Sequence, residues 1–116
     1  MKRDLSLFIK DILENMERAE KFVTGMTFEK FATDEKTIFA VIRCLEIIGE
    51  ATKQIPIELR QKYKNIPWRD MAGIRDKLIH AYFSINLELI WLAIKKDIPK
   101  IKPLIKQVLD DLQNHK

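Results

Sequence analysis

The chain has 116 residues, of which 47% are hydrophobic and 33% are charged, and it carries a formal net charge of +4. This length fits one domain over residues 1–116, and the balance of apolar and charged residues excludes a disordered chain. The small numbers of glycine and proline, three and four, argue against a turn-rich β-fold. The positive charge mildly favours an acidic partner such as nucleic acid.

Cys44 is the single cysteine, so the chain can form neither an internal disulfide nor a cysteine-based metal site. A lone thiol is consistent with a reducing cytoplasm, and we interpret this one as a small buried hydrophobe. The N-terminal segment carries a charge every few residues and lacks the unbroken apolar run of a signal peptide or a membrane span. We therefore expect a cytoplasmic protein that makes no membrane contact.

The first predicted element is an amphipathic helix from about Asp4 to about Thr24. Over residues 5–23, apolar side chains recur in steps of three and four, which places them on one helical face. Gly25 is expected to end this helix, and residues 27–32 suit a short helical turn.

A second long helix follows, with Asp34 as a good N-cap and Pro56 as its stop. Besides its main apolar stripe it carries Phe39, Cys44 and Ile47, which widen the apolar surface beyond one face. A helix that is apolar on more than one side lies at the centre of a bundle or faces another subunit.

The third long helix is expected to begin at Pro67, whose missing N–H costs nothing at a first helical position. The preceding residues 56–64 are polar and basic, and they suit a short helix or a loop. From Pro67 the helix should run through Arg75 toward Tyr82. Its buried face should consist of Met71, Ile74, Leu78 and Ala81.

The last helical region can be capped by Asn86 and has apolar residues in alternating steps of three and four over residues 87–112. This register survives Pro99 and Pro103, so we expect either one long helix kinked near Pro99 or two helices nearly in line. Together the elements predict an all-α fold, a four- to five-helix up-and-down bundle.

Histidine is scarce, and His80 lies in the segment IRDKLIHAYF near the end of the third predicted helix. Asp76 is four residues earlier, so on a helix its carboxylate can orient the imidazole and favour its protonated form. Arg75 is five residues earlier, which is roughly 140° around a regular helix. One straight helix therefore does not point Arg75 and His80 at one substrate, unless the arginine curls across, the helix distorts or a second copy of the chain contributes.

These residue types suit the cleavage of a phosphodiester in RNA. Histidine can remove the proton of the 2′-hydroxyl or protonate the leaving oxygen, and arginine can hold the phosphate through two N–H bonds. No metal is required, and the sequence offers no cluster of side chains at ligand spacing. The plainer interpretations are that His80 caps the end of the helix and that Arg75 forms a surface ion pair with Asp76 or Glu88.

Other side chains are candidates for contact with RNA. Trp68 and Trp91 could stack on bases, although core or interface anchors are the better interpretation. The main candidates for phosphate contact are Arg69, Lys77 and Lys64. A wider basic surface could also include Arg60, Lys62, Lys95, Lys96, Lys100, Lys102 and Lys106, although the later lysines suit an ordinary solvated helix face better.

The segment PWRDMAGIRDKLIHAYFSINLELIWLAIKKDIP resembles the signature region of the HepT-like branch of the HEPN superfamily. The HEPN motif is an arginine, a polar residue, a few further residues and a histidine, and Arg75 to His80 match it. The HepT-like branch adds a tyrosine two residues later, which Tyr82 matches. The residue after the arginine is often asparagine in this branch and is Asp76 here. The pattern also includes Trp68, Arg69, Asp70, Gly73 and Trp91.

This resemblance implies a single HEPN domain that acts as a ribonuclease toxin, endo- or exonucleolytic, on an RNA such as tRNA or mRNA. Arg75, His80 and Asp76 would be the catalytic residues, and no cofactor is implied. The partner would be an antitoxin of the MNT type, a minimal nucleotidyltransferase that transfers AMP to Tyr82. The resemblance also implies a homodimer whose two motifs face a shared cleft.

Two other functions stay open at this point. The chain could be a non-catalytic helical partner of a nucleotidyltransferase, or the substrate-binding subunit of one that modifies a small molecule. The presence of Arg75, His80 and Tyr82 together favours the ribonuclease, because a scaffold has no need of all three side chains.

Overall fold

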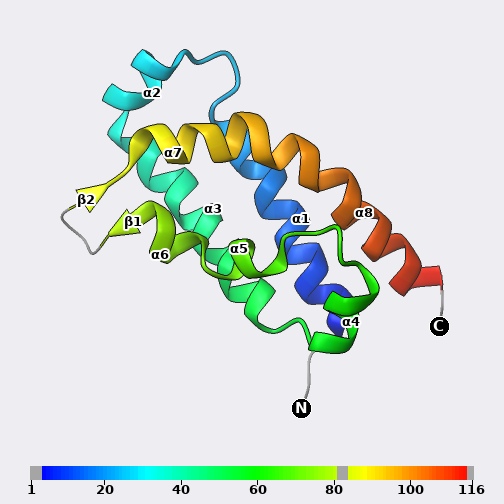
Figure 1. Cartoon of the computed structure of the whole chain (residues 1–116). Coiled ribbons are helices and arrows are strands. Elements are labelled where there is room, and N and C mark those ends of the chain that lie inside the picture. Colours follow the sequence, from blue (N-terminus) through cyan, green and yellow to red (C-terminus); the bar gives the residue numbers. More distant parts are fainter. Residues whose placement is uncertain (1–3, 81–83, 115–116) are drawn as a thin grey trace.

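The computed structural model describes residues 4–80 and 84–114, with the side chains of all of these except 78–80 and 84. Figure 1 shows the order and arrangement of the elements. In chain order they are α1 (Leu5–Phe22), α2 (Phe28–Thr33), α3 (Glu35–Lys53), α4 (Ile57–Lys62), α5 (Trp68–Ala72), α6 (Ile74–Leu78), β1 (Ile79–His80), β2 (Ser84–Ile85), α7 (Leu87–Leu92), the π-helix η1 (Ala93–Asp97) and α8 (Ile98–Asn114).

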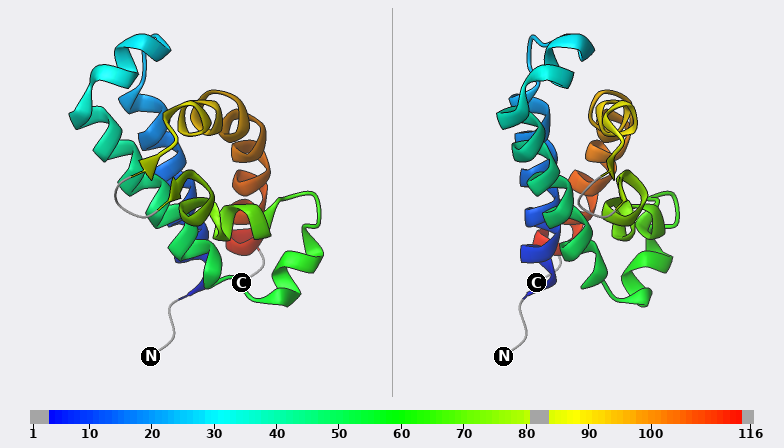
Figure 2. Two further views of the ribbon diagram at one scale, coloured as in Figure 1. Left: turned by 60° about the vertical axis from the view of Figure 1, so that its left-hand side comes forward. Right: turned by 90° about the vertical axis from the view of Figure 1, so that its left-hand side faces the viewer.

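The helices form two layers, which Figure 2 shows from the side. α1 and α3 pack side by side in one layer, and α5, α6 and the α7–η1–α8 helix lie against them in the other. Of the two positions suggested for the second long helix, the structure shows the central one, because α3 packs against α1, α2, α5 and α6. The predicted all-α bundle is therefore confirmed, with the short helices α2, α4, α5 and α6 added to its long segments.

Local capping signals set the ends of the long helices as predicted. At the start of α3, Asp34 Oδ1 accepts a hydrogen bond from the backbone N–H of Thr37 at 3.1 Å. At the start of α7, Asn86 Oδ1 accepts one from Leu89 at 3.1 Å. After α1, Gly25 has a φ of +78°, a conformation that residues with a side chain rarely adopt.

The core lies between the two layers and is made largely by the predicted apolar faces. Of the face predicted for the third helix, Met71 is buried and Ile74 half-buried, and the side chains of Leu78 and Ala81 lie outside the described part of the chain. Each large apolar side chain removed from water in the core contributes about 1.5–3 kcal/mol to stability. Phe31 of α2 is fully buried, with its ring centroid 5.3 Å from that of Trp91. The other fully buried side chains include Ile9, Ile12, Met16, Val41, Leu45, Ile48, Ile90, Ile94, Ile105 and Val108.

The prediction of one long third helix is wrong. Gly73 separates α5 from α6, and after α6 the backbone enters β1, where His80 lies opposite Ser84 of the antiparallel β2. A glycine costs a helix about 1 kcal/mol, and the β-branched and aromatic residues that follow α6 favour extended backbone. Tyr82, the predicted end of this helix, lies outside the described residues. Pro67 is the N-cap of α5 and not its first residue.

The last helical region is one continuous ribbon, drawn from yellow to red in Figure 1. Its α-helical ladder is interrupted by η1, which ends two residues before Pro99. Proline has no N–H to donate, and in an α-helix its ring presses on the carbonyl four residues earlier, here that of Lys95. A π-helical turn widens the ladder at this place. The interruption predicted near Pro99 is therefore a π-helical turn between α7 and α8. Pro103 lies inside α8.

None of the helices within residues 4–80 and 84–114 is both long and apolar enough to span a membrane.

Candidate active site

The α5–α6 segment crosses α3 at Gly49. A Cβ atom added to Gly49 would lie 3.4 Å from Ile74 Cγ2 and 3.4 Å from the carbonyl oxygen of Met71. Contacts of this length lie at the boundary between tight and ordinary Cβ contacts, so an alanine would need a shift of at most a few tenths of an ångström, whereas a larger side chain would push the segment outward. The glycine therefore allows close packing, which fixes where α6 presents its charged side chains.

Arg75 lies on α6 with 63% of its side-chain surface exposed. Its Nε–H donates a hydrogen bond to Glu46 Oε2 of α3 at 3.0 Å. Among the described residues, none accepts a hydrogen bond from the two Nη groups. The sequence suggested Asp76 or Glu88 as ion-pair partners, and the structure shows Glu46 instead.

Glu46 is the residue of this site that sequence reasoning missed. It is 29 positions from Arg75, and its side chain is only 24% exposed. Arg43 Nη1 lies 3.7 Å from Glu46 and 3.5 Å from Glu50. The sequence signal for Glu46 is its spacing: it stands one helical turn before Gly49, where α6 comes close to α3.

The prediction that Asp76 and His80 share one helical face is wrong. α6 ends before His80, which belongs to β1, and the helical angle between Arg75 and His80 no longer applies. Asp76 itself is exposed on α6, beside Arg75. The side chain of His80 and the whole of Tyr82 lie outside the described part of the chain.

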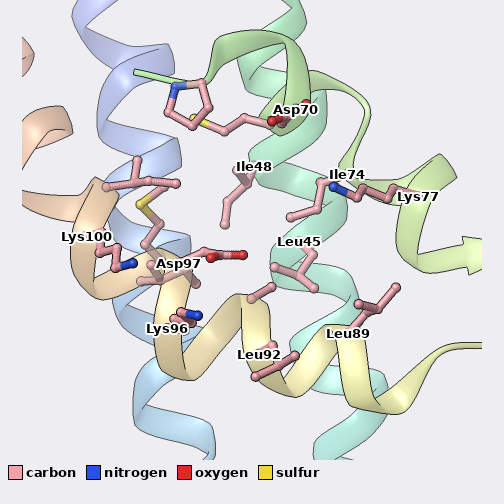
Figure 3. A pocket seen from close by; sticks show the side chains of 16 residues that line it. Leu45, Ile48, Asp70, Ile74, Lys77, Leu89, Leu92, Lys96, Asp97 and Lys100 are labelled. Atoms are coloured by element: carbon pink, nitrogen blue, oxygen red, sulfur yellow. The ribbon is translucent and has the colours of Figure 1, made fainter. Parts of the chain in front are cut away.

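A cavity of about 530 Å³ opens between α3, the α5–α6 segment and the α7–η1–α8 helix (Figure 3). Its floor is apolar, and charged side chains stand at its edge. Lys96 and Lys100 lie on one side and Lys77 on the opposite side, with the carboxylates of Asp70 and Asp97 between them. Lys77, a predicted RNA contact, is thus brought together with two of the later lysines, and the lysines offer positive charge to a phosphate.

The remaining basic candidates are not gathered at this cavity. Arg69 and Lys64 are exposed but do not line it. Arg60 is engaged in the fold, since its guanidinium donates to the carbonyl oxygens of Ile55 and Thr52 at 2.9 and 2.8 Å. Similarly, Lys102 is ion-paired with a glutamate of α1. The wider basic surface is therefore only partly available for contact with RNA.

The two tryptophans are anchors of the core, as interpreted. Trp68 is buried, and its indole N–H donates to the carbonyl oxygen of Tyr63 at 3.0 Å. Trp91 is half-buried against Phe28 and Phe31. Cys44 is also buried as expected, and burial raises the pKa of its thiol, which keeps it protonated and unreactive.

A second unpredicted contact joins distant parts of the chain. The hydroxyl of Tyr63 donates a hydrogen bond to Asp111 Oδ2 of α8 at 2.5 Å. Burial of the phenol is the larger cause, and the Asp111 carboxylate the smaller one, that together raise the pKa of Tyr63 to about 12.

Across residues 4–80 and 84–114, no three His, Cys, Asp or Glu side chains are grouped as metal ligands.

Comparison with known proteins places this chain in a family. The family model described as ribonuclease HepT-like matches residues 12–108. The chain is 50% identical over 102 residues to "Probable ribonuclease HepT" of Thermococcus cleftensis, which covers 88% of this chain and 93% of that protein. It is 43% identical over 112 residues to "Putative RNase MJ1216" of Methanocaldococcus jannaschii, which covers 97% of this chain and 93% of that protein.

No solved structure gives a significant match. The segment that the family model covers runs from α1 into α8 and includes all of Arg75 to Tyr82. The chain therefore belongs to the ribonuclease HepT-like family.

Proposed function

We propose that this protein is a metal-independent ribonuclease in which Arg75 and His80 act on an RNA phosphodiester. One observation carries the proposal: Glu46 holds the Arg75 guanidinium at Nε, the Arg75 side chain is 63% exposed, and no described residue accepts a hydrogen bond from its two Nη groups. A guanidinium presented in this way can bind a phosphate through two parallel N–H bonds. The family and the names of the relatives support the same chemistry.

In the proposed reaction, His80 removes the proton of a ribose 2′-hydroxyl, and the 2′-oxygen attacks the adjacent phosphorus. The bond from phosphorus to the 5′-oxygen breaks, and that oxygen takes up a proton. The products are a 2′,3′-cyclic phosphate and a 5′-hydroxyl end. Arg75 stabilises the charge that develops on the phosphate oxygens, and we assign to Asp76 the orientation of a His80 imidazole.

We further propose that RNA reaches this motif along exposed basic side chains. Lys77 stands with Lys96 and Lys100 at the edge of the cavity in Figure 3, and Arg69 and Lys64 are exposed nearby in the sequence. Phosphate contacts of this kind position a strand without reading its bases. They are consistent with an RNA substrate such as tRNA or mRNA.

A homodimer would complete the site. Arg75 lies on α6 and His80 on β1, and a second copy of the chain could bring the two motifs to one cleft. Phe39 of α3 is 59% exposed, and Leu89 and Leu92 of α7 are also exposed, so apolar surface is available for a partner. Sedimentation of the purified protein tests this part, and a monomer at micromolar concentration would remove the shared cleft.

We also propose that the protein is the toxin of a toxin–antitoxin pair in the cytoplasm. Its antitoxin would be an MNT-type nucleotidyltransferase that modifies Tyr82. In that step the phenol oxygen attacks the α-phosphorus of ATP, pyrophosphate leaves, and the phenol proton passes to a base of the partner. The added phosphate would compete with RNA for Arg75 and repel the incoming strand.

Analysis of the products tests the proposed reaction. Purified protein should leave 2′,3′-cyclic phosphate ends on a short RNA, and it should not cleave the same RNA with a single 2′-deoxyribose at the cleavage site. A circular form of the RNA separates the two modes of cleavage, because only an endonuclease can open it. If the deoxy substrate is cut equally well, the role of the 2′-hydroxyl is wrong. If no RNA is cut but the nucleotidyltransferase still binds, the chain is a non-catalytic partner.

A further inference from the structure

Glu46 and Gly49 lie on the same face of α3, one helical turn apart, where α6 crosses the helix. Gly49 allows the close approach, with a built Cβ only 3.4 Å from Ile74 Cγ2. Arg75 is the residue after Ile74, so its side chain starts beside this contact and reaches Glu46 Oε2 at 3.0 Å. These two residues of α3 therefore act on α6 together: Gly49 sets the distance between α3 and α6, and Glu46 holds Arg75.

The hydrogen bond uses one particular atom of the guanidinium. Arginine has five N–H donors, one on Nε and four on the two Nη atoms. Because Glu46 accepts from Nε–H, the pair of Nη atoms remains as a fork for the two oxygens of a phosphate. A carboxylate on the Nη atoms would instead block this fork.

Glu46 is better fixed than the arginine it holds. Its side chain is 24% exposed against 63% for Arg75. Its other oxygen, Oε1, lies 3.7 Å from Nη1 of Arg43, which also reaches Glu50 at 3.5 Å. A carboxylate between two guanidinium groups on a packed helix is a more rigid support than a lone surface residue.

We propose that Glu46 is a positioning residue that fixes Arg75 for the phosphate of the substrate. The inference rests on the proposed function, because it assigns to Arg75 the binding of that phosphate. Preorganised donors are effective because they need no rearrangement when charge develops. Two other roles predict different results: a glutamate that competes with RNA for Arg75 would inhibit cleavage, and an ordinary surface ion pair would not affect it.

The test compares Glu46→Ala and Glu46→Gln with the control variants Glu50→Ala and Glu50→Gln. Glu50 lies on the same helix and contacts Arg43 but does not contact Arg75. We expect Glu46→Ala to lower kcat for RNA cleavage by about tenfold to a hundredfold, with KM within about twofold. Glu46→Gln should retain more activity than Glu46→Ala, because its amide oxygen can still accept from Nε–H. The Glu50 variants should keep the wild-type kcat.

A second measurement tests the contact independently of activity. Hydrogen exchange of the arginine Nε–H groups can be followed by nitrogen-15 NMR, and the Arg75 signal is the one that Arg75→Lys removes. This proton should exchange slowly in the wild type and in Glu50→Ala, and faster in Glu46→Ala.

The two measurements distinguish a failure of the proposed function from a failure of the positioning role of Glu46. If the wild-type protein cleaves no RNA, the proposed function fails, and the exchange of the Arg75 Nε–H alone then decides whether Glu46 holds Arg75. If the wild type is active and Glu46→Ala is equally or more active, the positioning role is overturned. Unchanged Nε–H exchange in Glu46→Ala overturns it as well.

Discussion

Two arginines of this chain differ in how far they are bound into the fold. Arg60 is half-buried and donates two hydrogen bonds to carbonyl oxygens at the C-terminal end of α3, those of Thr52 and Ile55. Carbonyls at a helix end have no partner within the helix, so these bonds stabilise the end of α3. Within the described part of the chain, Arg75 has one partner, Glu46, and its side chain is 63% exposed.

This difference predicts opposite effects of alanine substitution. Arg60→Ala should lower the free energy of unfolding by about 1–3 kcal/mol, since it removes the side-chain donor from the Ile55 and Thr52 carbonyls, of which only Thr52 keeps a backbone donor, the N–H of Ile55. Arg75→Ala should lower it by less than about 1 kcal/mol, because the pair it removes is exposed, and it should still abolish RNA cleavage. Urea denaturation of the two variants measures the comparison. Equal destabilisation by both substitutions would show that Arg75 also supports the fold.

Tyr63 gives the protein a response to alkaline pH. Its pKa is raised to about 12, first by burial and then by Asp111. Because the folded pKa lies above the unfolded value of about 10, the contribution of Tyr63 to stability is complete below pH 10 and is lost as pH rises toward 12.

A spectroscopic titration checks this value. Tyr63 and Tyr82 are the two tyrosines of the chain, so the phenolate absorbance of the Tyr82→Phe variant reports Tyr63 alone. We expect a midpoint near pH 12 in the folded protein. A midpoint near the ordinary value of about 10, in protein that is still folded by circular dichroism, would contradict both the burial of Tyr63 and its bond to Asp111 in solution.

At the scale of the elements, the contact between α3 and the α5–α6 segment depends on Gly49. Gly49→Val should push the segment away from α3, cost about 1–3 kcal/mol of stability, and lower RNA cleavage by moving Arg75 from Glu46. Gly73→Ala is the matched control, because its Cβ would meet only the Arg69 carbonyl oxygen at 3.6 Å, an ordinary contact. Thermal unfolding and cleavage rates of both variants test this. Full cleavage activity in Gly49→Val would disprove the need for close packing.

Sequence reasoning succeeded where the signal is local. The caps Asp34 and Asn86 and the steps of three and four in the long helices involve residues within one or two turns of each other, so α1, α3 and α7–α8 could be predicted. The third helix could not, because apolar spacing over a short segment does not reveal that Gly73 divides it or that β1 pairs with β2.

The two side-chain contacts that sequence reasoning missed are long-range, which explains why they were missed. Arg75 and Glu46 are 29 positions apart, and Tyr63 and Asp111 are 48 apart. Such pairs depend on how whole helices pack, and one sequence does not determine that by pattern. The motif from Arg75 to His80 was found through resemblance to a family, whereas its helical geometry, inferred from residue spacing, was wrong.

At the scale of the whole molecule, regulation is predicted to act through Tyr82. Tyr82→Phe keeps the ring and removes the hydroxyl that would accept AMP. We expect this variant to stay toxic when the nucleotidyltransferase and ATP are present, whereas the wild-type protein is neutralised. Intact-mass measurement of the co-expressed wild-type pair should show AMP adducts that are absent from the variant. Adducts that persist in Tyr82→Phe would place the modification on another residue.

The rate of RNA cleavage in EDTA tests the central claim most directly. The wild-type protein should cleave a single-stranded RNA at the same initial rate with EDTA and with magnesium. Arg75→Ala and His80→Ala should each be at least about a hundredfold slower, with unchanged helical circular dichroism. Arg18→Ala, which removes an exposed arginine from α1, should keep the wild-type rate. Cleavage that stops in EDTA and returns with magnesium, or full activity in either site variant, would contradict the account.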